Sequence, residues 1–145
     1  MNVMIRRLKA GDELRACQVA AAFKSAQLSA ERVAQFLANP TNYLIVAESA
    51  ENLAGFVLAY RLERLDRTAA QLFVYEVGVA PQYQRRRVGS RLMEHVRHLV
   101  SEESLMEAFV ITDHSNDAAV RLYRSTGGQV EEAAGVLFVY PGHAA

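Results

Sequence analysis

Short apolar runs alternate along the chain with longer stretches in which apolar residues recur three and four positions apart. Compact apolar runs predict buried strands, and the longer period predicts amphipathic helices. The strands are expected at residues 3–8, 43–48, 53–63, 71–79, 106–112, 129–132 and 136–140. The helices are expected at residues 12–23, 29–39 and 116–125, with a further helix through Leu92 that ends near Ser101. This order predicts a mixed α/β sheet with helices on its faces.

The expected helix ends carry residues that are typical of such positions. Asp12 and Ser29 are candidate N-caps, because their side-chain oxygens can accept a hydrogen bond from an amide of the first turn. Pro40 disfavours a helical conformation at the residue before it. Gly127 and Gly128 follow the last helix and suit the left-handed turn that commonly ends one. The boundaries therefore support the order of elements that the apolar pattern predicts.

Length and charge narrow the range of functions. The chain has 145 residues, 51% of them hydrophobic, so a single domain over residues 1–145 with a sizeable core is expected. Lys plus Arg equals Asp plus Glu at 16 each, which argues against a nucleic-acid partner, since nucleic-acid-binding domains carry a basic excess. The longest apolar runs fall short of the about 20 residues that span a bilayer. With Cys17 as its single cysteine, the chain suits a reducing compartment, and a cytoplasmic protein without a membrane partner is expected.

A polar, arginine-rich segment joins the apolar strand at 71–79 to the helix through Leu92. A helix start exposes unpaired N–H groups and the positive end of the helix dipole, so it favours a phosphate group. Gly89 would let a phosphate approach the backbone closely, and residues 84–87 add donors and positive charge. An arginine-rich loop before a helix is also commonly a solvated cap. Taken alone, the segment leaves both interpretations open.

Two motifs resemble the GNAT superfamily of acetyltransferases. Residues 77–92 (VGVAPQYQRRRVGSRL) are similar to its Gln/Arg-x-x-Gly-x-Gly/Ala loop, although Arg87 stands where that pattern has its first glycine. Residues 116–128 (NDAAVRLYRSTGG) are similar to its N-x-x-A-x-x-L-Y-x-x-x-G helix. The resemblance implies a mixed, mostly antiparallel sheet flanked by helices on both faces. It also implies that acetyl-CoA is the cofactor.

The same resemblance implies which residues bind acetyl-CoA. Backbone amides of residues 84–90 would bind the pyrophosphate, and amides at 77–79 would stabilise the negative oxygen of the reacting acetyl group. Tyr123 would lie near the CoA sulfur and protonate the leaving thiolate, with a purely structural core tyrosine as the alternative. Arg87 either points outward and pairs with a phosphate or reflects a shifted loop. The residues expected to bind the cofactor are Val77, Gly78, Val79, Gln84, Arg85, Arg86, Arg87, Val88, Gly89, Ser90, Asn116 and Tyr123.

Glu76 is the candidate general base. A typical alkyl amine has a pKa near about 10, so a base must take a proton as the nitrogen attacks the thioester. Strict alternation along the strand at 71–79 would place Glu76 on one face with Leu72, Val74 and Gly78. A carboxylate inside such a strand is partly desolvated, which suits a proton acceptor. A solvent-facing or salt-bridged glutamate is the alternative.

A closer resemblance concerns the acetyl acceptor. Residues 58–60, 73–77 and 113–123 look like the aminoglycoside 3-N-acetyltransferases of the GNAT type, with Glu76 in place of an aspartate that ends an aromatic strand. The pair Glu131-Glu132 matches a further acidic pair of that family. Clustered carboxylates would attract and orient a polycation. The residues expected to bind the substrate are Tyr75, Glu76, Asp113, His114 and Asp117. A solvated rim with a helix cap at Asn116 or Asp117, and an ordinary loop histidine at 114, are the alternatives.

The sequence therefore predicts an acetyl-CoA-dependent N-acetyltransferase acting on a polycationic small molecule, in the first place an aminoglycoside antibiotic at its 3-N position. Proteins or peptides, polyamines and metabolite amines are alternative acceptors, and a non-catalytic acyl-CoA-binding module is a rival because of Arg87. His95 and His98 lack further ligands in a known pattern, so no metal site is expected. Relatives in this superfamily often pair through their C-terminal strands, which makes a homodimer plausible.

Overall fold

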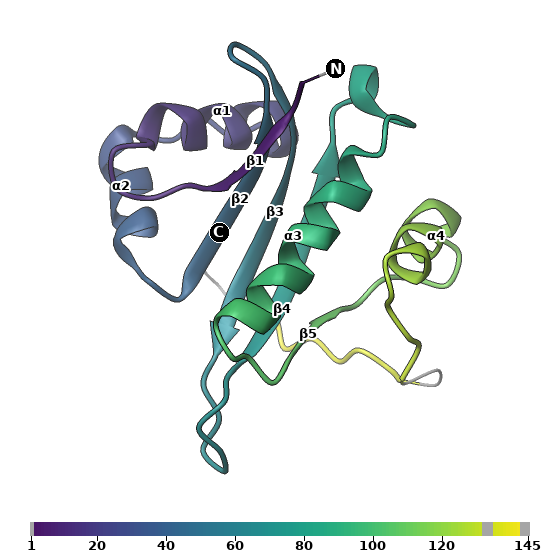
Figure 1. The fold of residues 1–145 in the computed structure, drawn as a ribbon. Coiled ribbons are helices and arrows are strands. Elements are labelled where there is room, and N and C mark those ends of the chain that lie inside the picture. Colours follow the sequence, from purple (N-terminus) through teal and green to yellow (C-terminus); the bar gives the residue numbers. More distant parts are fainter. Residues whose placement is uncertain (1, 132–134, 143–145) are drawn as a thin grey trace.

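The computed structural model describes residues 2–131 and 135–142, and it consists of one sheet with helices on both faces (Figure 1). In chain order the elements are β1 (Met4–Arg7), α1 (Glu13–Lys24), α2 (Ala30–Ala38), β2 (Asn42–Glu48), β3 (Leu53–Leu62), β4 (Gln71–Val79), a 3₁₀ turn η1 (Pro81–Tyr83), α3 (Val88–Glu102), β5 (Glu107–Val110) and α4 (Asp117–Ser125). These bounds confirm the predicted elements up to the last helix, within a few residues at each end. None of the described helices is long and apolar enough to cross a membrane.

The five strands lie in the order β1-β2-β3-β4-β5. The pairs β1–β2, β2–β3 and β3–β4 are antiparallel, whereas β4 and β5 are parallel. The parallel pair follows from the connection, because α3 carries the chain back along the sheet before β5 begins. The expected mixed, mostly antiparallel sheet with helices on both faces is confirmed.

Each face of the sheet has its own hydrophobic core. Alternation along β2 directs Ile45 towards α3 and Val46 towards α1 and α2. The α3 side contains Leu92, Val96 and Leu99 of the helix, packed with strand residues that include Ile45, Val57, Leu72 and Val74. The opposite side contains Val19 of α1 and Val33 of α2 packed with Leu44, Val46 and Phe56. All of these side chains are buried, so the two cores fix the helices on the sheet.

A β-bulge at Tyr75 changes which side chains of β4 share a face. Leu58 pairs with Glu76 and Ala59 pairs with Val74, so Tyr75 is an extra residue without a partner in β3. Val77 after the bulge therefore packs on the α3 side together with Val74 before it. Glu76 lies on the opposite face, that of α1 and α2. The prediction that Glu76 shares a face with Leu72 and Val74 is wrong, because strict alternation does not continue through a bulge.

Strands β4 and β5 run together only at one end. Gln71–Val74 of β4 pairs with Glu107–Val110 of β5, and β4 then continues to Val79 without a partner on that side among the described residues. The N–H of Ala80 donates to the carbonyl of Ala54 at 2.8 Å, so Gly78 also directs its main-chain groups towards β3. By the same alternation, Val77 and Val79 direct theirs towards the open side. This end of β4 therefore offers main-chain donors and acceptors to a ligand.

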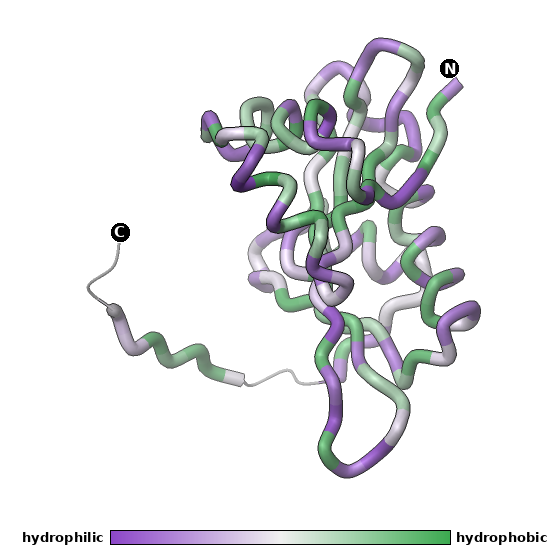
Figure 2. The backbone as a smooth tube through the Cα atoms, turned by 90° about the vertical axis from the view of Figure 1, so that its left-hand side faces the viewer, coloured by the Kyte–Doolittle hydropathy of each residue, from purple (hydrophilic) through white to green (hydrophobic). Residues whose placement is uncertain are grey.

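The segment after α4 does not form the two strands expected at 129–132 and 136–140. Residues 129–131 and 135–142 contain no strand, and Glu132 lies outside the described residues. The apolar pattern is typical of a strand, but a strand needs a neighbouring edge to pair with. Figure 2 shows the segment 135–142 apart from the body of the chain. Its large apolar side chains are exposed: Val136, Leu137, Phe138, Val139 and Tyr140.

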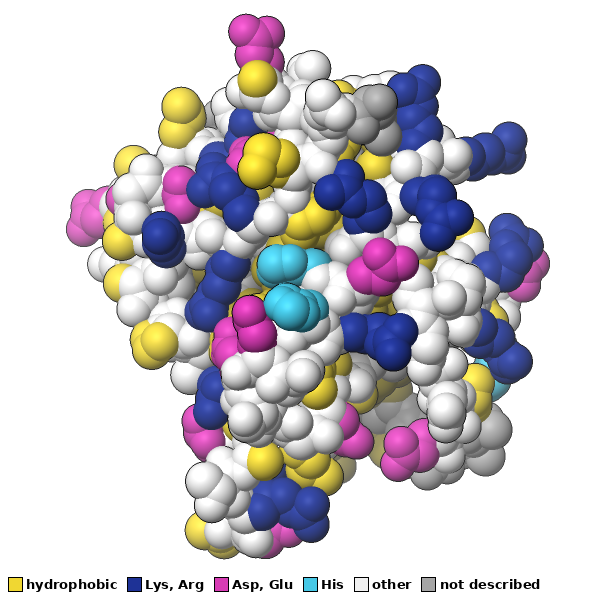
Figure 3. Space-filling model, viewed as in Figure 1, with side chains coloured by type: hydrophobic (Ala, Val, Ile, Leu, Met, Phe, Trp, Pro, Cys, Tyr) yellow, Lys and Arg dark blue, Asp and Glu magenta, His cyan; other side chains and the backbone are white. Residues whose placement is uncertain are grey.

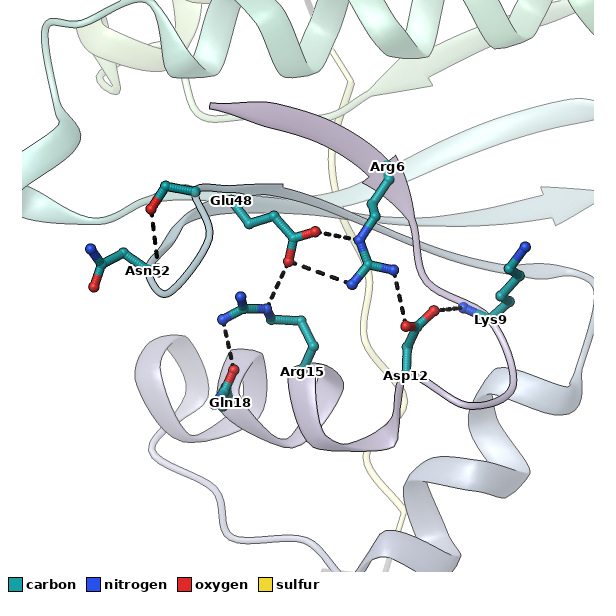
Figure 4. A network of polar contacts seen from close by, with 8 residues as sticks. Arg6, Lys9, Asp12, Arg15, Gln18, Glu48 and Asn52 are labelled. Carbon is teal, nitrogen blue, oxygen red and sulfur yellow. Dashed lines mark hydrogen bonds and ion pairs between the residues drawn. The ribbon is translucent and has the colours of Figure 1, made fainter. Parts of the chain in front are cut away.

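A polar network ties β1, β2 and α1 together (Figure 4). The Glu48 carboxylate pairs with Arg6 and, at 2.8 Å, with Arg15 Nε. Asp12 accepts hydrogen bonds from Arg6 Nη1 and from the Lys9 amide, each at 2.9 Å. Asp12 is the N-cap residue of α1, as predicted, but its side chain does not bond to the first turn, because its carboxylate is held by residues that precede the helix.

The cap predicted for α2 is confirmed. The Ser29 hydroxyl accepts a hydrogen bond from the Arg32 amide at 3.1 Å, and Ser29 itself has an extended backbone. This bond satisfies one of the amides that the first turn of a helix leaves unpaired.

Candidate functional site

The arginine-rich loop between β4 and α3 adopts a backbone conformation that glycine favours. Arg87, directly before α3, has φ 65° and ψ 16°, and Arg85 has φ 63°, so both lie in the left-handed region. Arg86 between them does not have a positive φ. Such an alternation turns successive main-chain amides towards a common point, an arrangement that binds anions. The left-handed conformation costs a residue with a side chain about 1 kcal/mol, so Arg87 retains the turn at the expense of strain.

The first turn of α3 presents unpaired amides beside this loop. The first intrahelical hydrogen bond runs from the Arg91 amide to the Arg87 carbonyl at 3.0 Å. In the described part of the chain, the amides of Val88, Gly89 and Ser90 have no protein acceptor. Together with the helix dipole, these amides form a site that fits a pyrophosphate group.

Side chains of the same loop add positive charge. Arg85, Arg86, Arg87 and Arg91 are exposed, and Figure 3 shows Lys and Arg side chains gathered at the end of the molecule where α3 begins. The side chain of Gln84 binds within the loop and not at the phosphate site, because its amide group donates a hydrogen bond to the Val79 carbonyl at 3.3 Å. It thereby holds the loop against the open end of β4.

Gly89 lies where α3, α4 and β4 meet. A Cβ atom at this position would stand 3.2 Å from Leu122 Cδ2 and 3.7 Å from Val79 Cγ2. The absence of a side chain therefore lets α4 approach α3 closely, in addition to the approach of a phosphate that the sequence suggests. Its φ is not positive, so the reason for a glycine here is space and not backbone conformation.

Helix α4 packs against α3 beside the open end of β4. Leu122 and Tyr123 are partly buried against the same core cluster as Val77 and Val79. Burial raises the pKa of the Tyr123 hydroxyl above its ordinary value, so this side chain holds its proton at neutral pH. Asn116 caps the helix, since its Oδ1 accepts a hydrogen bond from the Ala119 amide at 3.1 Å. The alternative interpretation of Asn116 as a helix cap is thus confirmed.

Glu76 forms an ion pair with Lys24 from the last turn of α1. The Glu76 side chain is 24% exposed and that of Lys24 is 50% exposed. The hydrogen bond from Lys24 to Glu76 and the charge of the carboxylate raise the pKa of the lysine above its ordinary value. The structure thus matches the salt-bridged alternative for Glu76 in its resting state. Sequence reasoning missed Lys24, because nothing local to a helix end indicates a partner in a distant strand.

An aromatic wall, formed by Tyr60, Phe73, Tyr75 and Phe109, extends from Glu76 along the same face of the sheet. Tyr75 lies edge-on to Tyr60 and to Phe73, with ring centroids 5.7 Å apart in each pair. Phe73 stacks on Phe109 with centroids 4.9 Å apart. Tyr75 is 57% exposed, so the wall is open to solvent. Burial, with the nearby Tyr75 and Glu76 as further causes, raises the pKa of Tyr60.

The remaining predicted substrate residues lie in the loop before α4 and in its first turn. Asp113 accepts hydrogen bonds from the amide and hydroxyl of Ser115, at 2.9 and 2.8 Å, and these bonds lower the pKa of its carboxyl group. Asp117 is the first residue of α4, and both Asp117 and His114 are exposed. The structure thus brings Tyr75 and Glu76 together, whereas no described hydrogen bond or ion pair joins Asp113 or Asp117 to them.

Comparison with known families matches residues 12–127 to the acetyltransferase (GNAT) family. The chain is 37% identical over 94 residues to the N-alpha-acetyltransferase RimI of Mycobacterium tuberculosis. That alignment covers 64% of this chain and 56% of the RimI protein, so little more than half of that relative is spanned.

Among solved structures, the chain is similar to an aminoglycoside acetyltransferase, meta-AAC0020, from an uncultured soil metagenomic sample, determined in complex with trehalose and in complex with sisomicin. The TM-score is 0.88 at 25% identity, with 96% of this chain and 95% of that chain covered. The fold is also similar to that of AAC(6')-Iy in complex with a bisubstrate analog, CoA-S-monomethyl-acetylneamine, with a TM-score of 0.75 at 16% identity. This last alignment covers 97% of this chain and 99% of that one.

Proposed function

We propose that this chain acetylates an amino group of a polycationic small molecule. The chain belongs to the acetyltransferase (GNAT) family, and such enzymes use acetyl-CoA. An aminoglycoside is the first candidate acceptor, with the 3-N position as the proposed site. The observation that carries this proposal is the Glu76 carboxylate beside an open aromatic wall, where it already holds an ammonium group, that of Lys24. A carboxylate and aromatic rings together suit a cationic amine carried on a sugar ring. The complex of the structurally similar meta-AAC0020 with sisomicin supports the same acceptor class.

The cofactor site of this proposal follows the open end of β4 and the start of α3. The amides of Val88, Gly89 and Ser90 would bind the pyrophosphate, with the guanidinium groups of the preceding loop around it. The main-chain groups of Val77 and Val79 that point to the open side would bind the pantetheine arm and the acetyl oxygen. Two features support these roles: the unpaired amides of the first turn of α3, and the left-handed backbone at residues 85 and 87.

In the proposed reaction Glu76 accepts a proton from the substrate ammonium group, directly or through water. The neutral nitrogen then forms a bond to the acetyl carbon while the carbon–sulfur bond breaks, and the nitrogen gives its second proton to water as the amide forms. Tyr123 donates its hydroxyl proton to the departing sulfur, a role that its raised pKa allows, because the side chain is protonated at neutral pH. Acetyl-CoA supplies the activated acetyl group, and the aromatic wall orients the acceptor.

The experiment that tests the proposed function is a thiol-release assay with a panel of amines. The panel contains gentamicin-type and kanamycin-type aminoglycosides, spermidine and short peptides. We expect saturable release of CoA with the aminoglycosides. Saturation with another class alone would overturn the aminoglycoside proposal. Failure of every amine in the panel to stimulate CoA release would overturn the proposed activity as a whole.

A second candidate acceptor is the N-terminus of a protein. The identity of 37% to the N-alpha-acetyltransferase RimI favours this alternative, although the alignment covers only part of both chains. Polyamines and metabolite amines are further alternative acceptors, and spermidine represents the polyamines in the panel. Membership of an enzyme family supports catalysis over the non-catalytic acyl-CoA-binding rival. A peptide that saturates the enzyme while aminoglycosides do not would favour this second candidate.

A homodimer is part of the proposal. The segment 135–142 exposes a run of apolar side chains, and β5 is an edge strand of the sheet. Exposed apolar runs and unpaired sheet edges are commonly covered by a partner chain. We therefore propose that a second copy covers this segment. Light scattering should give twice the monomer mass, and Phe138→Asp should reduce it to the monomer mass. A monomeric parent protein at the same concentration would contradict this assignment.

A further inference from the structure

We propose that the enzyme acetylates its own Lys24 at Nζ when no external amine occupies the acceptor site. This inference rests on the proposed function, because it assigns a second, internal acceptor to the same carboxylate and the same acetyl donor. Lys24 would then be a modification site within the active site.

In the ion pair, the Lys24 ammonium group lies against Glu76 as the amine of an acetyl acceptor would lie against the general base. Lys24 Nζ donates a hydrogen bond to Glu76 Oε2, the atom that would take the proton from a substrate. The contact joins residues 52 positions apart, so the fold places this ammonium group there. Its partner Glu76 lies on the face of the sheet that carries the aromatic wall, so the ion pair lies on that face as well. An external ammonium group would occupy the same place.

Lys24 is free to reach and to leave this position. It is the last residue of α1, and Ser25, which follows it, has a left-handed φ of 51°. Half of its side chain is exposed, and a lysine carries its amine on a flexible four-carbon stem. A polycationic acceptor would therefore compete with Lys24 for Glu76, and the exchange needs no movement of the sheet.

The transfer to Lys24 balances with groups that are already assigned. Glu76 takes a proton from the Lys24 ammonium group, and the nitrogen lone pair forms a bond with the acetyl carbon of acetyl-CoA. The carbon–sulfur bond breaks, and the sulfur leaves as a thiolate that takes the Tyr123 hydroxyl proton. The nitrogen loses its second proton as the amide forms, and this proton returns through water to the Tyr123 oxygen. The products are N-acetyl-Lys24 and free CoA. The acetylated side chain is neutral, so it no longer pairs with Glu76.

The sequence provides a matched internal control. Lys9 and Lys24 are the two lysines of the chain, and the remaining cationic side chains are arginines. Lys9 is exposed and lies in the turn before α1, where its main-chain amide binds Asp12. Non-enzymatic acetylation of exposed lysines would modify Lys9 at least as readily as Lys24.

The test is to incubate the purified protein with acetyl-CoA alone and to locate acetyl groups by intact-mass measurement and peptide mapping. We expect one acetyl group on Lys24 and little on Lys9, at a first-order rate that does not depend on protein concentration. Lys24→Arg should abolish the modification, and Lys9→Arg should leave it in place. Glu76→Gln should slow it by roughly a hundredfold, as expected for loss of a general base. An aminoglycoside that the enzyme turns over should protect Lys24.

Several results would overturn the inference. One is that Lys24 stays unmodified, and another is that Lys9 and Lys24 are acetylated equally. The others are a rate constant of Lys24 acetylation that rises with protein concentration, and Lys24 acetylation at the parent rate in Glu76→Gln. The amine panel, run on the same preparation, separates the two proposals. Turnover of an amine with an unmodified Lys24 overturns the internal acceptor alone, whereas the absence of turnover with every amine overturns the proposed function.

Discussion

The carboxylate of Glu76 in β4 and the ammonium group of Lys24 at the end of α1 form an ion pair on the face of the sheet that carries the aromatic wall. The bulge at Tyr75 allows this ion pair to form, because it directs the Glu76 side chain away from the α3 core and towards α1. The proposed base therefore rests against a cation of its own chain. Any cationic acceptor that uses Glu76 must first displace Lys24.

Removing that cation should improve the binding of the acceptor. In Lys24→Met, the KM for a cationic acceptor should fall roughly two- to fivefold, because an exposed ion pair is worth up to about 1 kcal/mol. Steady-state kinetics with the best amine of the panel measures the effect. Lys9→Met is the control, since Lys9 precedes the start of α1 whereas Lys24 is its last residue, and the loss of Lys9 removes the same charge. An unchanged or higher KM in Lys24→Met alone would contradict competition at Glu76.

The left-handed conformation of Arg87 predicts opposite effects on stability and on cofactor binding. Arg87→Gly should raise the free energy of unfolding by about 0.5 kcal/mol, since relief of strain exceeds the added entropy of the unfolded chain. The same variant should bind acetyl-CoA more weakly, because it loses a guanidinium group beside the proposed pyrophosphate site. Denaturant unfolding and calorimetric titration measure the two effects.

Arg87→Ala is the matched variant for that comparison. It removes the same charge but keeps a side chain at a left-handed residue, so it should weaken acetyl-CoA binding equally without the gain in stability. Equal stability of the glycine and alanine variants would contradict the strain, and undiminished binding in both would remove Arg87 from the cofactor site.

Gly78 is predicted to tolerate no side chain. A Cβ atom there would lie 2.6 Å from Phe56 Cε1 and 3.1 Å from Phe23 Cδ1, so the two packed rings would have to move. Gly78→Ala should therefore lower the free energy of unfolding by about 1–3 kcal/mol. Thermal and denaturant unfolding measure the loss.

The double variant Gly78→Ala with Phe56→Leu distinguishes crowding from other causes. If the clash with the Phe56 ring is the reason, the double variant should lose less stability than the sum of the two single changes. Strict additivity would show that the ring is not what excludes the side chain.

The network at Glu48 predicts how stability depends on pH. Burial alone would raise the pKa of Glu48, but the hydrogen bond from Arg6 and the charges of Arg6 and Arg15 outweigh it and hold the pKa below its ordinary value. A carboxyl group with a lowered pKa in the folded state contributes stability above its unfolded pKa of about 4.3. That contribution is lost as the pH falls through the lower, folded value.

Urea unfolding at several pH values from neutral to acid checks this dependence. Glu48→Gln should be less stable than the parent at neutral pH, and the difference should shrink in acid. Glu51→Gln is the control, because Glu51 is exposed in the neighbouring turn. A constant difference between parent and Glu48→Gln across the pH range would contradict the linkage.

Local chemistry made several features predictable from the sequence. The strand at residues 71–79 is bounded by polar turns and matches β4 residue for residue, and the Ser29 cap needs only its own helix to form. The α4 motif includes its cap at Asn116 and ends beside Gly127, which has a φ of 99°. Each of these features depends on neighbours in the sequence.

Features set by distant neighbours were not predictable in the same way. The face of Glu76 depends on how β3 pairs across the bulge at Tyr75, and its partner Lys24 comes from another element. Aspartate is a common helix cap, yet the carboxylate of Asp12 accepts its hydrogen bonds from Arg6 and from the Lys9 amide. The apolar run at 136–140 is typical of a strand, but among the described residues it pairs with neither edge of the sheet.

The most direct test of the account is the turnover of Glu76→Gln with the best amine acceptor. The change preserves the shape of the side chain but removes the proton acceptor, so kcat at neutral pH should fall by roughly 10²–10⁴-fold. Binding of acetyl-CoA, measured by calorimetry, should stay close to that of the parent. Glu63→Gln, an exposed glutamate paired with Arg61, is the control and should retain the parent rate. Turnover of Glu76→Gln equal to that of the parent would contradict the proposed mechanism.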